Sequence, residues 1–175
     1  MRKFLILMIS VGILSCANNK TEQVSTIKIK DEKAQKISKM MESYVNNNFD
    51  SSIISEDAKI KFNQLEMTKT DFENLVTTHH AMFNKISFPE GWMETVNYIG
   101  ADVKNAGGKY ADDYGSTWTS HWSDWTAVSK ISGDTISNHC FFGYKWENDK
   151  IVEVSAIFPD EAFNKELAMF MEANK

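Results

Sequence analysis

The chain has 175 residues, a formal net charge of −5 and a charged fraction of 25%. An acidic chain without a run of basic residues is poorly suited to binding nucleic acid, so we expect no nucleic-acid partner. Only two cysteines occur, Cys16 and Cys140, which excludes a disulfide-rich scaffold.

Residues 1–15 have the pattern of an export signal peptide. Arg2 and Lys3 precede the apolar run FLILMISVGIL, which is shorter than the ~20 residues that a membrane-spanning helix needs. The letters ILSC, which end at Cys16, resemble the processing box of bacterial lipoproteins. This resemblance implies cleavage before Cys16 and its lipidation, and Ala17 then favours the outer membrane of a Gram-negative cell. The alternative is an ordinary signal peptide followed by a chance cysteine.

The polar residues 16–30 predict a lipidated cysteine and a flexible tether, which leaves residues 31–175 as one domain. An apolar stripe at helical spacing predicts a first helix over 31–48. Alternation of apolar and charged residues then predicts a short strand over 58–63. Thr70 and Glu73 have capping-box spacing and predict a second helix that runs to about residue 85.

The later part of the chain is rich in strand patterns. After a predicted strand over 93–103, the stretch 110–146 predicts a long hairpin with its turn at Ser132, Gly133 and Asp134. Asn148 and Asp149 predict a second tight turn into a third arm over 151–158. A last helix is expected to begin near Pro159. Helices followed by long antiparallel strands indicate an α+β fold.

Three segments resemble the nuclear-transport-factor-2-like (NTF2-like) superfamily, in particular its SnoaL-like and ketosteroid-isomerase-like branches. They are YVNNNFD at 44–50, SEDA at 55–58 and WENDKIV at 146–152. The resemblance implies a cone in which helices pack on a strongly curved antiparallel sheet around one pocket, and a homodimer formed through the outer sheet face. Ketosteroid isomerases carry a carboxylate base at the end of the first strand. Here that place is occupied by Asn63, which cannot accept a proton.

The register of the long hairpin decides which side chains face the pocket. A three-residue loop over 131–133 pairs Lys130 with Asp134 and sets Trp122 opposite Phe142. We favour this register because it gathers the apolar side chains on one face, whereas a two-residue loop mixes the two sets. The outer face would then carry His121, Trp125, His139 and Phe141. The candidate pocket residues are His79, Trp118, Trp122, Asp124, Phe142, Tyr144 and Glu153.

Metal, cofactor and nucleophile signatures are missing from the sequence. His79 and His80 are neighbours on a helix and point about 100° apart, so they cannot hold one ion. His121 and His139 are expected roughly 13 Å apart along the strand. Cys140 has no evident base, and no GxSxG motif occurs. We therefore expect no metal and no cofactor.

Three functions remain open. The first is a membrane-anchored domain that binds a small apolar or aromatic molecule without catalysis. The second is an isomerase, dehydratase or hydrolase that uses Asp124 or His79 as general base, assisted by Tyr144 or Glu153. The third is a cell-surface glycan- or protein-interaction module with exposed tryptophans such as Trp92 and Trp125.

Overall fold

A computed structural model describes residues 25–89 and 91–175 of the chain. Its elements in chain order are β1 (Thr26–Ile29), α1 (Glu32–Val45), β2 (Ile54–Phe62), β3 (Leu65–Met67), α2 (Lys69–Met82), β4 (Phe83–Ser87), β5 (Gly91–Asn97), α3 (Ala101–Asn105), α4 (Gly108–Asp112), β6 (Thr117–Ser129), β7 (Thr135–Glu147), β8 (Lys150–Ile157) and α5 (Glu161–Ala173).

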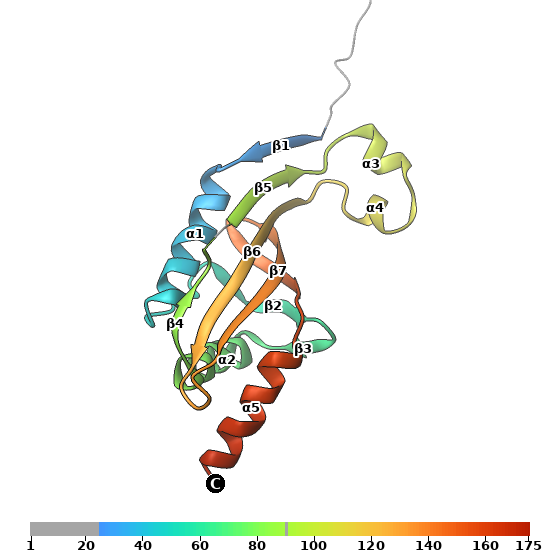
Figure 1. Ribbon diagram of the computed structural model, residues 1–175. Helices are drawn as coiled ribbons and strands as arrows, with labels where there is room; N and C mark the ends of the chain where they lie inside the picture. The colour runs from blue at the N-terminus through green and yellow to red at the C-terminus, as the bar shows by residue number, and fades with distance from the viewer. Residues whose placement is uncertain (1–24, 90) are drawn as a thin grey trace, which may run out of the picture.

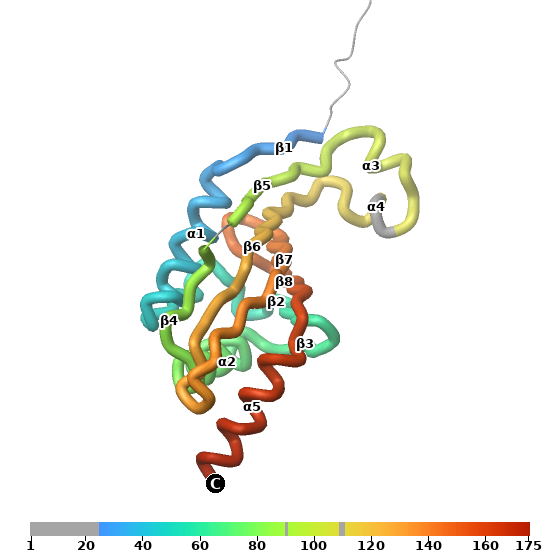
Figure 2. The backbone as a smooth tube through the Cα atoms, viewed as in Figure 1, coloured from blue at the N-terminus to red at the C-terminus, as the bar shows by residue number. Residues whose placement is uncertain are grey.

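In this described part, eight strands form one curved, open sheet in the order β1-β5-β6-β7-β8-β2-β3, and β4 pairs with β6 beyond the end of β5 (Figure 1). The predicted α+β fold is confirmed. The sheet is mixed, however, because β2 runs parallel to β8, whereas a purely antiparallel sheet was expected. Strand β8 pairs with β7 on one side and with β2 on the other, and all three are labelled on the tube in Figure 2.

The predicted signal peptide 1–15 and the lipidation site Cys16 lie outside the described residues. The tether predicted up to residue 30 is wrong at its end, because residues 26–29 form β1 and pair with β5 from Thr26↔Asn97 to Ile29↔Glu94. Within the described residues, none of the helices has both the length and the apolarity required to cross a membrane.

A buried polar network fixes the N-terminus of α1 on the sheet. Asp31 caps the helix by accepting a hydrogen bond from the Ala34 amide at 2.9 Å, and it also accepts one from the Thr95 hydroxyl at 2.8 Å. Thr95 and Thr119 share a hydrogen bond of 2.9 Å, and the Trp146 indole donates to Thr119. Both threonines are fully buried, so these bonds offset the cost of removing their hydroxyls from water.

The second helix begins earlier than predicted. The capping box is formed by Thr68 and Asp71, which donate and accept reciprocally, and not by Thr70 and Glu73. Glu73 instead accepts a hydrogen bond from Ser51 at 2.5 Å. Both Thr68–Asp71 and Thr70–Glu73 have the spacing of a capping box. The sequence favoured the second pair because the usual box has Glu or Gln at its last position, whereas the first pair has Asp. The helix ends at Met82, because Phe83 starts strand β4 on the edge of β6.

The expected register of the long hairpin is wrong by one residue. Trp122 pairs with Phe141 and Asp124 with His139, because four residues, 130–133, form the loop in place of three. Ser129 and Asp134 close it through a backbone hydrogen bond of 2.9 Å, and Gly133 takes the left-handed conformation with φ of 78°. The first strand of the hairpin also starts later than expected, since residues 108–112 form α4.

The turn at Asn148 and Asp149 is the predicted two-residue loop, since Glu147 pairs with Lys150. Both turn residues have positive φ, 46° and 64°, as such a turn requires. A β-bulge follows, however, between the pairs Trp146↔Ile151 and Lys145↔Glu153. The extra residue reverses the facing of the rest of β8, so that Val154 is buried beside Tyr144.

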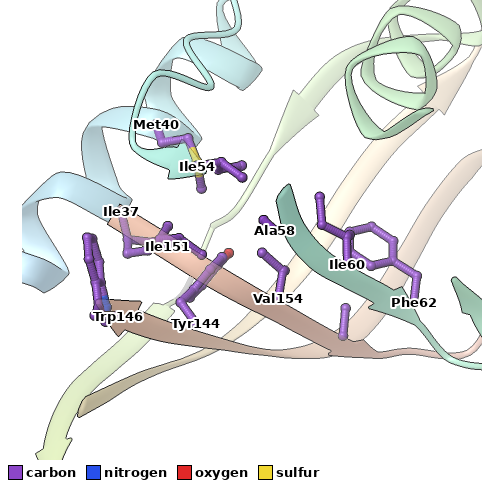
Figure 3. Packing of buried hydrophobic residues seen from close by; sticks show 11 residues of the cluster. Ile37, Met40, Ile54, Ala58, Ile60, Phe62, Tyr144, Trp146, Ile151 and Val154 are labelled. Carbon is purple, nitrogen blue, oxygen red and sulfur yellow. The ribbon is translucent and has the colours of Figure 1, made fainter. Parts of the chain in front are cut away.

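Two apolar clusters fill the space between the helices and the concave face of the sheet. The first joins α1 to β2, β7 and β8, with Ile37 and Met40 above Tyr144 and Trp146 (Figure 3). The second joins α2 and β4 to the other half of the hairpin, through Val76, Phe83 and Trp125. Helix α5 packs its Phe163, Leu167 and Phe170 against this second cluster.

Candidate functional site

A cavity of about 190 Å³ lies between the two clusters. Its interior lining is aromatic and aliphatic, and its mouth is marked by exposed residues of β3 and of the start of α5. The lining residues are Met40, Met41, Tyr44, Phe49, Phe62, Asn63, Leu65, Met67, Phe72, Leu75, Val76, His79, Phe88, Trp125, Asn138, Cys140, Phe142, Tyr144, Val154, Phe158, Asp160, Phe163 and Asn164.

A short hydrogen-bonded relay crosses this apolar interior. The Trp125 indole donates to the Tyr44 hydroxyl at 2.8 Å, and the same hydroxyl lies 2.9 Å from His79 Nδ1. Because the hydroxyl already accepts the indole proton, its own proton is best placed on Nδ1. Burial raises the pKa of Tyr44 far above its ordinary value, so the phenol stays neutral.

His79 lines the cavity and has a second ring nitrogen, Nε2, outside this relay. With Nδ1 as the acceptor, Nε2 carries the proton and becomes a donor, and no described residue accepts from it. Burial, and to a smaller extent the adjacent His80, lowers the pKa of His79 to about 4. The imidazole is therefore neutral near pH 7, where it donates a hydrogen bond but is a weak base.

Two further titratable side chains line the cavity, the thiol of Cys140 and the phenol of Tyr144, and the pKa of each is raised. Burial raises the pKa of the Cys140 thiol to about 11, and the thiol donates to the Ser123 carbonyl oxygen at 3.1 Å. Burial likewise raises the pKa of Tyr144 strongly. Neither group supplies an anion at neutral pH, so neither is a prepared nucleophile.

No protein-family model matches the sequence, and no curated protein matches it either. Solved structures do match. A protein from Xanthomonas campestris pv. campestris assigned as a polyketide cyclase superposes with a TM-score of 0.55 at 10% identity, covering 75% of this chain and 93% of its own. AclR from Streptomyces galilaeus, assigned as a hydroxylase, gives 0.52 at 13% identity, covering 79% and 96%. An NTF2-like protein from Burkholderia xenovorans LB400 gives 0.50 at 11% identity, covering 77% and 94%.

The chain has the NTF2-like fold. The resemblance inferred from the sequence is thereby confirmed at the level of the fold. The matched structures carry different assigned activities, so the NTF2-like scaffold alone does not decide the chemistry of this cavity.

Three of the seven candidate pocket residues line the cavity of this NTF2-like domain. His79 reaches it from α2, and Phe142 and Tyr144 reach it from β7. The ring planes of Phe142 and Tyr144 are stacked at 14° with centroids 6.2 Å apart.

Trp118, Trp122, Asp124 and Glu153 face away from the cavity, and their prediction as lining residues is wrong. The one-residue change in register turns the first three to the outer face of β6, and the bulge in β8 does the same for Glu153. Trp118 donates to Asp113. Asp124 accepts from His139 at 2.7 Å on the exposed surface.

The same shift reverses two residues that were expected on the outer face. Trp125 and His121 point inward and are 8% and 2% exposed. His121 stacks between Phe88 and Phe142, and its Nδ1 has no partner in the part of the chain that the structure describes. His139 and Phe141 do lie on the outer face.

Sequence reasoning missed Tyr44, Trp125 and Asn138 as cavity residues. Tyr44 lies in the predicted first helix and begins the segment 44–50 that resembles the superfamily, but neither pattern assigned it to the pocket. Asn138 lies between Ile136 and Cys140, so the two-residue alternation of the strand could have found it. Among the described residues, no cluster of three histidines, cysteines or carboxylates is arranged to hold a metal ion.

The two buried histidines predict a pH-dependent stability. Burial lowers the pKa of both His79 and His121 to about 4, below the ordinary value of about 6.5. As the pH falls through 6.5 the unfolded chain takes up these protons first. Stability is therefore full above about pH 6.5 and declines toward pH 4, by up to about 1.4 kcal/mol per pH unit for each histidine.

Urea unfolding at pH 7.5 and 5.0 measures this loss. His79→Phe should reduce the difference between the free energies of unfolding at the two pH values, because it removes one of the two rings whose pKa is lowered. Equal free energies of unfolding at the two pH values would contradict neutral burial of these rings.

Proposed function

We propose that this protein is a lipid-anchored NTF2-like domain of the bacterial cell envelope that binds a small apolar or aromatic molecule in its cavity without transforming it. The observation that carries the proposal is the cavity lining itself. Its interior is apolar, its polar relay is neutral, and its one carboxylate among the described residues, Asp160, lies at the exposed mouth. An apolar cavity of about 150 Å³ is already able to hold a benzene ring.

Catalysis by a general base is less well supported. The structure removes Asp124 and Glu153 from the cavity, which leaves His79 as the base that the sequence suggested. A pKa of about 4 leaves little driving force for proton abstraction near neutral pH. Trp125 is buried and so cannot serve as an exposed platform for a sugar ring, whereas Trp92 is 52% exposed.

A cavity-filling variant tests ligand binding. Leu75 lines the cavity from α2, and Leu75→Trp should occupy part of its volume. We expect at least a tenfold weaker affinity for the uncharged apolar dye N-phenyl-1-naphthylamine, measured by fluorescence titration. The matched control is Met171→Trp on α5, since Met171 is 62% exposed and lies outside both the cavity lining and the outer face of the sheet. Equal affinity of both variants would place dye binding outside the cavity and contradict the proposal.

The lipid anchor has its own test. Cys16→Ala in the full-length chain, expressed in a Gram-negative host, should abolish incorporation of labelled palmitate and release the protein from the membrane pellet. Cys140→Ala should change neither, because Cys140 is buried in the domain. Wild-type protein found in the soluble periplasmic fraction, without label, would refute the anchor.

We further propose that two copies associate through the outer face of the sheet. Four large apolar side chains follow one another across adjacent strands there, through the pairs Trp92↔Trp122, Trp122↔Phe141 and Phe141↔Ile157. Trp92, Trp122 and Ile157 are 45–63% exposed. The face also carries both signs of charge, in Lys145 opposite Glu153. A second copy can therefore cover the row without like-charge repulsion.

Sedimentation velocity measures this association. Trp122→Glu places a charge in the middle of the row and should shift the protein to the monomer, whereas Met171→Glu on α5, also at an exposed apolar position, should not. A wild-type protein that sediments as a monomer at every concentration would disprove the dimer.

A further inference from the structure

The side chain of Asn138 is the unexplained polar group of the cavity. Asn138 is only 7% exposed and lines the cavity from β7. Its carboxamide makes no hydrogen bond to any residue within 25–89 and 91–175. An amide that faces a cavity and lacks a protein partner needs water or a ligand to complete its hydrogen bonds.

Asn138 and His79 flank the same indole ring. Asn138 is the cross-strand partner of Trp125 in the hairpin, and the ring of His79 lies 5.8 Å from the ring of Trp125, centroid to centroid. All three line the cavity. Next to Trp125 the cavity therefore has a carboxamide, which supplies an N–H donor and an oxygen acceptor, and the imidazole of His79, whose Nε2–H is a donor.

We propose that the ligand is an apolar body with an uncharged amide head, and that the head binds between Asn138 and His79. This inference rests on the proposed ligand-binding function. An amide carbonyl accepts from the Asn138 N–H and from His79 Nε2–H, while the amide N–H donates to Asn138 Oδ1. All three groups of the protein are then satisfied. A ketone satisfies the two donors and leaves the Asn138 oxygen buried without a partner, which lowers its affinity.

A carboxylate head is disfavoured by the charges around the cavity. Among the described residues, the lining contains no lysine or arginine, and its one acidic member, Asp160, lies at the mouth. Burying an anion without a cation or a full set of donors is unfavourable. The same holds for a cationic head, because the interior carries no carboxylate.

Three probes of nearly identical shape separate the alternatives: benzamide, acetophenone and α-methylstyrene. They differ in whether the substituent on the ring donates and accepts, only accepts, or does neither. Dissociation constants for the wild-type protein and for Asn138→Leu, an apolar replacement of similar size, are measured by NMR titration. We expect the substitution to weaken benzamide at least tenfold, acetophenone less, and α-methylstyrene not at all.

Two further measurements fix the interpretation. His79→Leu should weaken benzamide and acetophenone to a similar degree, because both offer a carbonyl oxygen. Asn84→Leu, at an exposed position of β4 outside the cavity lining, should affect none of the probes. Without ligand, Asn138→Leu should raise the melting temperature by about 3 °C, since it replaces a carboxamide that has no protein partner with an apolar side chain in an apolar cavity. A purely structural asparagine would lower it.

The outcomes separate this inference from the function on which it rests. If all three probes bind and Asn138→Leu changes them alike, the amide head is wrong and the apolar cavity stands. If no probe binds the wild-type protein, the ligand-binding function fails and the amide head fails with it.

Discussion

Pairing of Ser129 with Asp134 at the closed end of the long hairpin sets the facing of every side chain on β6 and β7. Once this pair is fixed, odd-numbered residues of β6 and even-numbered residues of β7 face the helices. Trp125 and Asn138 then meet on the concave side, and Trp122 and Phe141 meet on the convex side. The cavity and the outer apolar row are both consequences of this one contact.

The loop holds one conformation because its serine hydroxyls bind both the loop backbone and a buried carboxylate of α5. Ser129 Oγ accepts from the backbone amides of Ile131 and Ser132 and donates to Glu166 of α5 at 2.5 Å. Ser132 Oγ donates to the same carboxylate at 2.9 Å. Glu166 is only 4% exposed. The loop is thus held by a residue more than thirty positions further along the chain.

That distance explains where sequence reasoning succeeded and where it stopped. Local signals were sufficient for the α+β order, for the turn at Asn148 and for the face of α2 that carries His79. The length of the loop before Asp134 was not a local property, since a three-residue and a four-residue loop both suit the sequence and Glu166 helps to select between them. One residue of error then moved Trp118, Trp122 and Asp124 to the wrong side. The bulge in β8 had no signal in sequence and moved Glu153 in the same way.

The chemistry of the cavity is defined by neutrality. Solved structures with the same fold carry assigned enzymatic activities. In this cavity, burial keeps the phenols of Tyr44 and Tyr144 and the imidazole of His79 uncharged at neutral pH. A relay from Trp125 through Tyr44 to His79 fixes the orientation of one donor without generating a charge. Such a site distinguishes ligands by hydrogen bonds that they complete, and an NTF2-like scaffold can support that task as readily as catalysis.

Loops at the surface of a domain usually tolerate inserted or deleted residues. The β6–β7 loop should be an exception. An insertion there would change which residues of the hairpin face the helices. It would also displace Ser129 and Ser132, which bind Glu166 of α5. Helix α5 would move with them, and its Phe163 ring lies 5.1 Å from the His79 ring, centroid to centroid. By contrast, a Cβ atom added to Gly107, between α3 and α4, or to Gly108, the first residue of α4, would meet no atom within 4 Å. Length variation, affinity tags and circular permutation are therefore better accommodated at that connection, far from the residues that shape the cavity.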